Sequence, residues 1–344
     1  MKKVSLLIFL VIVMFSSYGN EKEHRFYSIP GKITMTTGGS SKTVEFRLNK
    51  GSGHDVAGLS GTVTIDWGDG SVVETVEFFE DGIDLSYEYS DTISKTVTIT
   101  STHLTGFVKY GNRPVTSLNV SEAPGLVLLS LLRTYEEVDY VNRRIKFIDV
   151  SHQLSKLDLS KNIALEFLTI GLCQLSELDV TKNIALTHLD ASYNQLAELD
   201  LSKNMVLTHL DARNNQLAKL DISNNMVLTN LIADNNQLTE LKISNNKVLK
   251  VLYFNNNQLT KLDVTQNTVL EELYVKNNRL DAATLNALFK TLHNIDVIPN
   301  WSTFFDDNSV GFKRIINITG NPGSTNCDLK IANEKGWGVV RNRP

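Results

Sequence analysis

Residues 186–206, LTHLDASYNQLAELDLSKNMV, decide the fold, because residues 207–227, LTHLDARNNQLAKLDISNNMV, repeat them with five changes. The repetition runs from residue 145 to about residue 290, with turns that start at Ile145, Leu165, Leu186, Leu207, Leu228, Leu249 and Leu270. A fixed period of this length predicts a solenoid of stacked turns. No turn could stand alone, since each needs its neighbours to bury its apolar face.

Inside each turn, the apolar residues fall at positions 1, 4, 6, 11, 14, 16 and 21, as in Leu186, Leu189, Ala191, Leu196, Leu199, Leu201 and Val206. The spacing is neither a helical stripe nor a plain alternation. It consists of two tandem copies of LxxLx(apolar)xxN, each predicting a short strand whose fourth and sixth residues point inward. The Asn then turns the corner, and we expect all seven apolar positions to be buried.

The pattern LxxLxLxxN-x-L is similar to the leucine-rich repeat, over residues 145–290. The phrases NQL and LDLSKN, and the ending INITGNPGSTNCDLKIANEKGWGV, resemble leucine-rich-repeat surface proteins of the Bacteroidetes and, more distantly, the internalins. This resemblance implies a right-handed arc whose broad concave face binds a macromolecule, with no catalytic machinery and no cofactor.

The first residues, MKKVSLLIFLVIVMFSSYGN, predict a secretory signal peptide over residues 1–19. Lys2 and Lys3 precede an apolar run from Val4 to Phe15, and small residues allow a cut after Gly19. The alternative, a membrane anchor, is disfavoured because the run is shorter than the ~20 residues that span a bilayer. We expect an exported chain with no membrane span after cleavage, at the cell surface, in the periplasm or secreted.

The net charge of the chain limits the classes of partner that we expect. Loss of Lys2 and Lys3 takes the formal net charge from −4 to −6, whereas nucleic acids and anionic membranes attract basic surfaces. We therefore expect no nucleic-acid partner.

The two cysteines are too far apart for a disulfide. Cys173 takes the Asn position of its turn, and Cys327 lies five turns later, which at ~4.8 Å per strand is at least ~24 Å, beyond the reach of a bridge. We interpret Cys173 as a buried corner residue; a reactive thiol is the alternative.

Residues 20–103 follow a different pattern. KITMTT, TVEFRL, GTVTIDW, VETVEFF, DLSYEYS and KTVTITS are alternating segments separated by turn residues, and they predict a small antiparallel β-sandwich. DWGDGS at 66–71, together with YEYS, resembles the PKD type of immunoglobulin-like module, although only GDGS matches closely. A calcium site at Asp66 and Asp69 would need six or more oxygen ligands, so we favour a structural turn.

The repeat reaches into the adjoining segments. Residues 104–125 fit it with one extra residue, and residues 126–144 form a degenerate turn, so we expect about nine turns over residues 104–290, joined to the sandwich without a linker. At the other end, LDAATLNALFKTLHN predicts an amphipathic helix with Asp281 as N-cap. Residues 291–344, with IINITG as a strand, NPG as a turn and Gly336 ending a helix, complete a C-terminal cap.

Positions 3, 5 and 7 of each first strand point outward, and in this family that strand lines the concave face. These positions hold Phe147, Asp149 and Ser151; Phe167, Thr169 and Gly171; His188, Asp190 and Ser192; His209, Asp211 and Arg213; Asn230, Ile232 and Asp234; Val251, Tyr253 and Asn255; and Glu272, Tyr274 and Lys276. Tyr253 beside Tyr274, and Phe147 beside Phe167, would place aromatic side chains on adjacent turns, and exposed aromatics are enriched in interfaces. A neutral surface with scattered aromatics is the plainer interpretation.

The residues predicted to bind a partner are therefore Phe147, Phe167, His188, Asp190, His209, Asp211, Arg213, Ile232, Tyr253, Tyr274 and Lys276.

The second strand of each turn carries a column of acidic residues at Asp158, Asp179, Asp200, Asp221 and Asp263, broken by Lys242. Each Asp stands two residues before a Ser or Thr, where a carboxylate can accept a hydrogen bond from the backbone of the next corner. Lys161, Lys182 and Lys203 dilute the repulsion. A linear cation site is the alternative.

His188 and His209, with Asp190 and Asp211 beside them, could hold a transition metal, but no nucleophile or pocket accompanies them. The sequence thus predicts a non-enzymatic binding protein that recognises a protein ligand. A carbohydrate-binding surface protein and a purely structural envelope component remain the alternatives.

Overall fold

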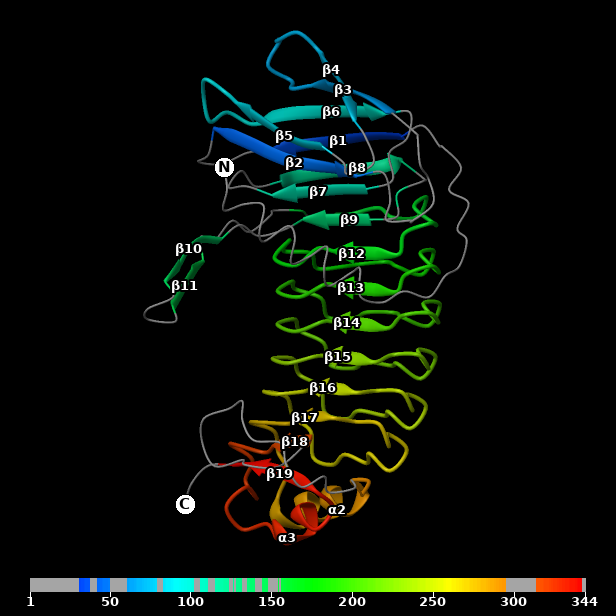
Figure 1. The fold of residues 1–344 in the computed structure, drawn as a ribbon, viewed down its shortest axis with the longest axis vertical. Helices are drawn as coiled ribbons and strands as arrows, with labels where there is room; N and C mark the ends of the chain where they lie inside the picture. Colours follow the sequence, from blue (N-terminus) through cyan, green and yellow to red (C-terminus); the bar gives the residue numbers. More distant parts are fainter. Residues whose placement is uncertain are drawn as a thin grey trace.

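The structure is a computed structural model that describes residues 31–37, 42–49, 61–78, 83–101, 106–110, 115–123, 126, 128–131, 135–139, 144–147, 154, 156–294 and 314–341 (Figure 1). The predicted signal peptide, residues 1–19, lies outside the described residues, as do Asp149 and Ser151 of the predicted binding face. None of the helices in the described ranges is long and apolar enough to cross a membrane.

Near the N-terminus, the described strands include an antiparallel sheet in the order β4-β3-β6-β1-β8. Its strands are β1 (Gly31–Thr37), β3 (Gly61–Asp66), β4 (Glu74–Phe78), β6 (Lys95–Ser101) and β8 (Val115–Glu122). Strict alternation in β1 places Ile33 and Met35 in the core, because successive side chains of a strand point to opposite faces. Aromatic side chains also pack together in this part of the molecule. The rings of Trp67 and Tyr87 are stacked, with their centroids 4.7 Å apart.

A second sheet runs through most of the molecule in the order β19-β18-β17-β16-β15-β14-β13-β12-β9-β7-β2-β5. It begins with β2 (Thr43–Asn49), β5 (Ile83–Glu88), β7 (Gly106–Tyr110) and β9 (Leu128–Leu131). Strand β7 pairs antiparallel with β2 and parallel with β9, so the N-terminal strands and the solenoid share one sheet. This continuity fits the prediction of a junction without a linker. The boundary at residue 103 and the closed PKD-like sandwich stay predictions.

The solenoid is mainly β and has about seven turns of about 21 residues. Each turn contributes one three-residue strand: β12 (Phe167–Thr169), β13 (His188–Asp190), β14 (His209–Asp211), β15 (Asn230–Ile232), β16 (Val251–Tyr253) and β17 (Glu272–Tyr274). The parallel register matches repeat to repeat, with Leu168 opposite Leu189 and Leu189 opposite Leu210. The predicted positions 1, 4, 6, 11, 14 and 16 are buried in the five turns that start at Leu165, Leu186, Leu207, Leu228 and Leu249.

Two columns of buried Asn hold the corners. Asn194, after the strand, accepts a hydrogen bond from the Leu175 N–H at Oδ1 and donates through Nδ2 to the Ile170 and Ala191 carbonyls. Asn204, in the other column, donates to the carbonyls of Val180 and Asn183 in the preceding turn. The prediction that Asn turns the corner is therefore confirmed.

The prediction of a buried position 21 is wrong. Val206 is 45% exposed and Val227 is 45% exposed. The reason is local: the Asn204 N–H donates to the Leu201 carbonyl and the Leu207 N–H donates to the Asn204 carbonyl. These two tight turns put the Asn204 side chain inside and leave the two residues that follow it on the outside.

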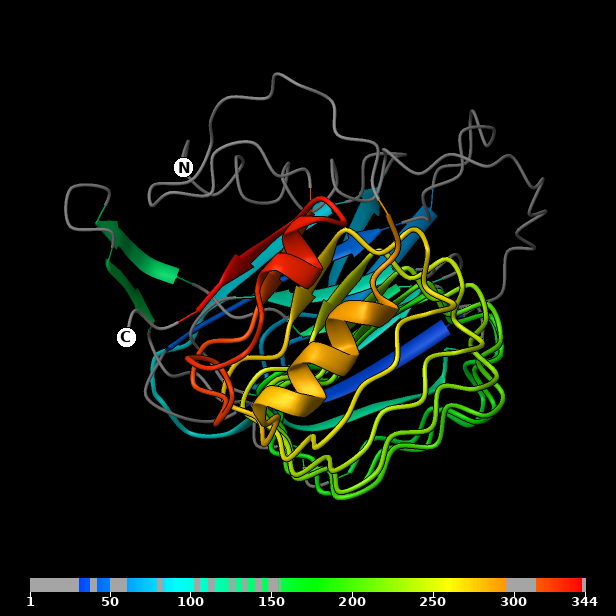
Figure 2. The same ribbon diagram turned by 90° about the horizontal axis from the view of Figure 1, so that it is seen from below.

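A turn starting at Ile145 is also wrong, and with it the count of nine turns. Residues 144–147 form β11 (Arg144–Phe147), which pairs antiparallel with β10 (Tyr135–Asp139) in a sheet of their own. Strand β12 pairs directly with β9 instead, so β9 supplies the preceding rung. The hairpin stands beside the ladder in Figures 1 and 2. Antiparallel pairing of segments close in sequence needs only a short loop, whereas a rung must close a much longer one.

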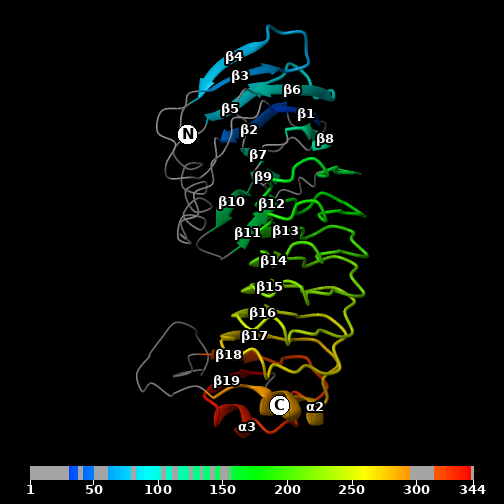
Figure 3. The ribbon, with the colours of Figure 1, turned by 90° about the vertical axis from the view of Figure 1, so that its right-hand side faces the viewer.

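The C-terminal segment continues the ladder. After helix α2 (Ala282–Thr291), β18 (Arg314–Asn317) and β19 (Trp337–Val340) add parallel strands to β17, with α3 (Lys330–Asn333) between them. Asp281 is the N-cap of α2, with its side chain accepting from the Thr284 N–H, as predicted. Gly336 has φ of +83° just after α3, also as predicted. Figures 2 and 3 show α2 and α3 at the end of the solenoid.

Candidate binding face

The outward side chains of β12–β17 form one surface, which we call the strand face. It consists of Phe167, Thr169, His188, Asp190, His209, Asp211, Asn230, Ile232, Val251, Tyr253, Glu272 and Tyr274, all of them half-buried. Figure 3 shows the solenoid from the side, with these strands stacked along one edge. Because the inward Leu of each strand fills the core, the solenoid does not require any particular side chain on this face.

A column of flat rings begins the strand face. Phe167 and His188 stack with ring centroids 4.9 Å apart, and His188 and His209 stack at 4.3 Å with an interplanar angle of 10°. The predicted neighbour of Phe167 was Phe147, and that placement is wrong, because Phe147 lies in β11 of the separate hairpin. His188 takes the place beside Phe167 on the face.

The threonine before each histidine fixes the imidazole. The Thr187 hydroxyl donates to the Glu166 carbonyl and lies 2.9 Å from His188 Nδ1. Because a hydroxyl has one proton, Nδ1 is the donor in that second contact and carries the hydrogen. Thr208 holds His209 in the same way. The predicted binding residues did not include these threonines, although the repeated phrase THL was a signal for them.

Burial favours the neutral form of both imidazoles. It lowers the pKa of His188 to about 4, with the neighbouring His209 adding to the effect, and burial also lowers the pKa of His209. Two neutral rings can stack closely, whereas two imidazolium cations at this separation would repel each other.

Carboxylates and one guanidinium lie beside the ring column. Arg213 forms an ion pair with Asp211 at 2.5 Å, and Asp190 accepts a hydrogen bond from the Ser192 N–H. Asp234 accepts from the Asn255 N–H at 2.6 Å. Burial raises the pKa of Asp211 against the opposing effect of Arg213, and burial raises the pKa of Asp234. These groups are thus partly desolvated while they still face outward.

Two tyrosines occupy the far end. The rings of Tyr253 and Tyr274 lie 4.6 Å apart with an interplanar angle of 57°, so the prediction that they meet on adjacent rungs is confirmed. The Tyr253 hydroxyl donates to Glu272 Oε2, and burial together with this bond raises its pKa. Ile232 precedes Tyr253 in the same column, whereas Lys276 is exposed at the corner and donates its N–H to Asn255 Oδ1.

Within the described residues, no group of three or more His, Cys, Asp or Glu side chains is placed to hold a metal ion. The alternatives that the sequence left open have structural explanations. Asp69 accepts from the Ser71 N–H and the Tyr87 hydroxyl, as expected of a structural turn. Cys173 is a fully buried corner residue without a disulfide, as predicted, and burial raises its thiol pKa.

The acidic column of the second strands is explained by its turns. Asp200 Oδ1 accepts from the Ser202 N–H at 2.9 Å, which confirms the predicted hydrogen bond to the next corner. This bond, the Ser202 hydroxyl and Lys203 lower the pKa of Asp200. The same Asp to Ser or Thr contact recurs at Asp158, Asp179, Asp221 and Asp263.

No model of a known protein family matches the chain, and no curated protein matches it. Solved structures do. The functional domain of InlJ from Listeria monocytogenes has 24% identity and a TM-score of 0.45, with 67% of this chain and 51% of that one covered. YopM of Yersinia pestis, a leucine-rich effector protein, has 24% identity and a TM-score of 0.36, with 60% and 58% covered.

A further neighbour is the leucine-rich-repeat ectodomain of the Arabidopsis thaliana receptor kinase GASSHO1/SCHENGEN3, solved in complex with Casparian strip integrity factor 2. It has 21% identity and a TM-score of 0.42, with 55% of this chain and 23% of that one covered. All three neighbours are leucine-rich-repeat proteins, and this chain spans less than two thirds of the length of each.

Proposed function

We propose that this chain is an exported, non-enzymatic binding protein that recognises a protein ligand through the strand face. The observation that carries the proposal is that rings and partly desolvated carboxylates are fixed in place on a surface that the solenoid does not need for packing. Fixed aromatic and charged side chains lose little conformational entropy on binding, which favours them as binding determinants.

The distribution of groups favours a partner with basic and apolar side chains. In the middle of the strand face and directly beside it, Asp190, Asp211 and Asp234 outnumber Arg213, and Arg213 is already engaged by Asp211. Asp190 and Asp211 lie beside the ring column, on the same strands as His188 and His209, and the tyrosine pair lies on later strands. Electrostatic complementarity of this kind sets the choice of partner and its association rate.

A carbohydrate ligand is the second candidate, and the tyrosine pair favours it. Two tilted rings beside the Glu272 carboxylate offer both an apolar platform and a hydrogen-bond acceptor, which suits a sugar ring. Protein binding at Asp190, Asp211 and Asp234 weakens as salt rises, because exposed charges are screened. Sugar binding at the tyrosines tolerates salt and is competed by free sugars.

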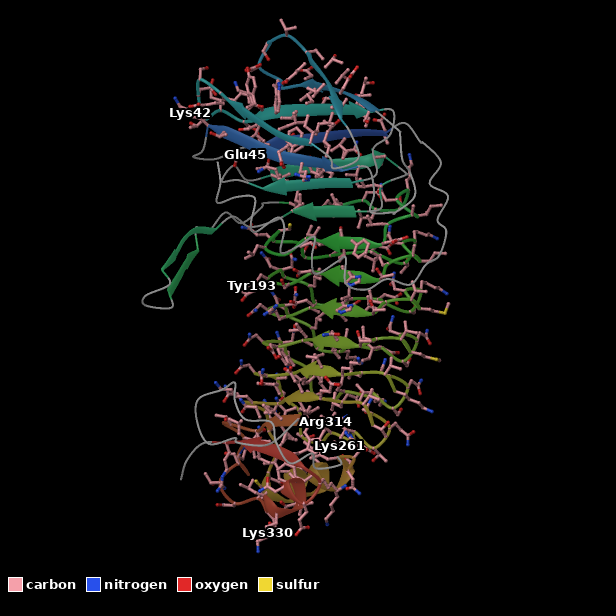
Figure 4. The ribbon with its side chains drawn as sticks, in the orientation of Figure 1. Lys42, Glu45, Tyr193, Lys261, Arg314 and Lys330 are labelled. Carbon is pink, nitrogen blue, oxygen red and sulfur yellow. The ribbon has the colours of Figure 1, made fainter. Side chains whose placement is uncertain are left out.

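The deciding experiment is binding of the chain, from residue 20 onward, to an array of extracellular-matrix proteins and glycans. It is run beside a Tyr253→Ala/Tyr274→Ala variant and a Tyr193→Ala control. Tyr193 is 47% exposed and lies at the corner of its turn, off the strand face (Figure 4). Circular dichroism must first show that both variants fold.

A protein hit that the double variant loses and the control keeps supports the proposal, whereas a glycan hit with the same behaviour favours the second candidate. Absence of any hit, or equal binding by the double variant, contradicts binding at the tyrosine pair and favours a purely structural envelope component. For export, the expected result is a mature N-terminus at Asn20; an uncleaved chain would contradict it.

We propose in addition that the two ends protect the solenoid. Residues 20–103 would form a PKD-like sandwich as the N-terminal cap, and residues 291–344, together with α2, a C-terminal cap. Open solenoid ends expose apolar surface and need such caps for solubility. Leu285, Leu288 and Phe289 of α2 are buried, which supports the second part. Deletion of residues 282–344 should therefore make the solenoid aggregate.

A further inference from the structure

The turns that precede the strands carry exposed apolar side chains at the same position of successive repeats. Ile163 is 62% exposed, Ile184 61%, Met205 61% and Met226 58%. In the adjacent column, Val206, Val227, Val248 and Val269 are 45%, 45%, 43% and 37% exposed. We call these eight side chains the edge stripe. It is separate from the strand face, because its residues lie in the turns that precede the strands β12–β17 along the chain.

The edge stripe is held straight by the core beneath it. The two tight turns described at Asn204 recur at Asn183 and Asn225, so the two residues after the Asn are directed outward in the same way in each of these repeats. Rungs of the ladder are ~4.8 Å apart, and the stripe therefore forms a regular row along the solenoid. The solenoid core is complete without it, because the Leu residues on either side of these turns are already buried.

The size of the edge stripe is that of a binding surface. A fully exposed Val, Ile or Met side chain presents roughly 60–120 Å² of apolar area. Eight such side chains at about half exposure present roughly 250–500 Å², in the range of the largest, often functional, apolar patch on a monomer. A standard interface buries about 800 Å² on each partner, of which about 57% is apolar. The six of these side chains from Ile163 to Val227 present roughly 180–360 Å² and can thus supply a large share of the apolar part of one interface.

Polar residues flank the edge stripe, as a polar rim flanks the apolar core of an interface. Lys161, Lys182 and Lys203 are exposed two residues before the apolar column in three turns. The column that begins at Ile163 changes to Lys247 and Thr268 in the later turns, so its large side chains occupy four successive repeats. A bounded apolar row beside polar columns is the usual anatomy of an interface, with an apolar core and a polar rim.

We propose that the part of the edge stripe from Ile163 to Val227 is the contact surface of a homodimer, in which two copies pack these four repeats antiparallel about a two-fold axis. A second copy is the occupant whose apolar side chains have the same spacing from rung to rung, so that all four large side chains can meet their counterparts. A two-fold axis closes the assembly at two chains. Centred on the row, the axis places Ile184 opposite Met205 of the second copy and leaves both strand faces open.

Sedimentation equilibrium of the chain from residue 20 onward tests the proposal. The expected result is a concentration-dependent dimer for the wild type. In a Met205→Lys/Met226→Lys variant the dissociation constant should rise by more than about a hundredfold, because four ammonium groups would have to enter an apolar contact. The matched control is Thr268→Lys, which adds a lysine to the same column beyond the four-repeat row and should dimerise like the wild type. The replaced side chains are exposed, so all variants should fold.

Cysteine cross-linking tests the antiparallel arrangement. A mixture of Ile184→Cys and Met205→Cys chains should form disulfide-linked heterodimers faster than either chain alone forms homodimers, since Cys173 and Cys327 are buried. A monomeric wild type, a dimer that survives in the double lysine variant, or faster homodimer cross-linking would overturn the proposal. A monomer that binds lipid vesicles through these residues would overturn it in favour of a membrane surface.

Discussion

The two columns of buried Asn should contribute unequally to stability, because their side chains make different hydrogen bonds within a single turn. Asn215 uses all of its polar groups: the two hydrogens of Nδ2 are shared among the carbonyls of Ala191, Ala212 and Arg213, and Oδ1 accepts from the Leu196 N–H at 3.0 Å. Asn225 makes two, through Nδ2 to Leu201 and Asn204, and its buried Oδ1 has no partner. Replacement by Ala should therefore affect stability unequally.

Asn215→Ala removes three hydrogen bonds worth ~1 kcal/mol each and leaves the Leu196 N–H buried without an acceptor, which costs ~1 kcal/mol or more, so the free energy of unfolding should fall by about 4 kcal/mol. Asn225→Ala removes two such bonds, but it also removes a buried, unpaired oxygen whose desolvation costs ~1–3 kcal/mol, so the fall should be about 1 kcal/mol or less. The carbonyls that Asn225 contacts keep their backbone donors, Asn204 N–H and Leu207 N–H.

Equilibrium unfolding in urea, followed by far-ultraviolet circular dichroism, measures both changes. A difference of about 3 kcal/mol separates the two midpoints by ~1–3 M urea. The truncation is chemically the same at both sites, so each variant is the control of the other. Faster amide hydrogen exchange at Leu196 in Asn215→Ala alone would confirm the cause. If Asn225→Ala were as destabilising as Asn215→Ala, the reasoning from unpaired oxygens would be refuted.

Two further predictions concern single side chains. Tyr193 has φ of +53° at a corner where Asn214 and Asn235 have φ of +54° and +55°. Because Asn tolerates positive φ better than Tyr does, Tyr193→Asn should raise the free energy of unfolding by about 1 kcal/mol. A lower melting temperature of this variant would contradict the prediction. Burial lowers the pKa of His188 to about 4, below its ordinary value of 6.5, so its contribution to stability is complete above pH 6.5 and is lost as pH falls toward 4. Between pH 7 and 5, the melting temperature should therefore fall less in His188→Asn, which copies Asn230 of the same column, than in the wild type. An equal fall in both proteins would contradict this role of His188.

Much of the solenoid follows from the sequence because each turn contacts mainly its neighbours. When one pattern recurs every 21 residues, Leu168 must meet Leu189, and the register of the whole ladder is fixed by the period. The same local logic explains why Asp200 could be assigned to its turn and Asp281 to its helix. The contacts of Asp200 and Asp281 lie within three residues along the chain, so they do not depend on distant parts of it.

The errors share the opposite cause. Position 21 is as apolar as the core positions, yet Val206 is exposed because two backbone turns around Asn204 direct it outward. Ile145 fits the repeat, yet residues 144–147 pair with β10, since a nearby strand competes with stacking in the ladder. Composition cannot decide either outcome, because both depend on where the backbone goes.

The sequence by itself determined the repeat, its inward columns and the outward residues from which a binding face is made. Only the tertiary structure decided that His188 lies between Phe167 and His209, and that Arg213 is held by Asp211. It also joined eight side chains of successive turns into the edge stripe. The physical reason is that a repeat specifies which residues become neighbours across rungs, whereas the rotamers, burial and partners of outward side chains are set by the packed surface as a whole.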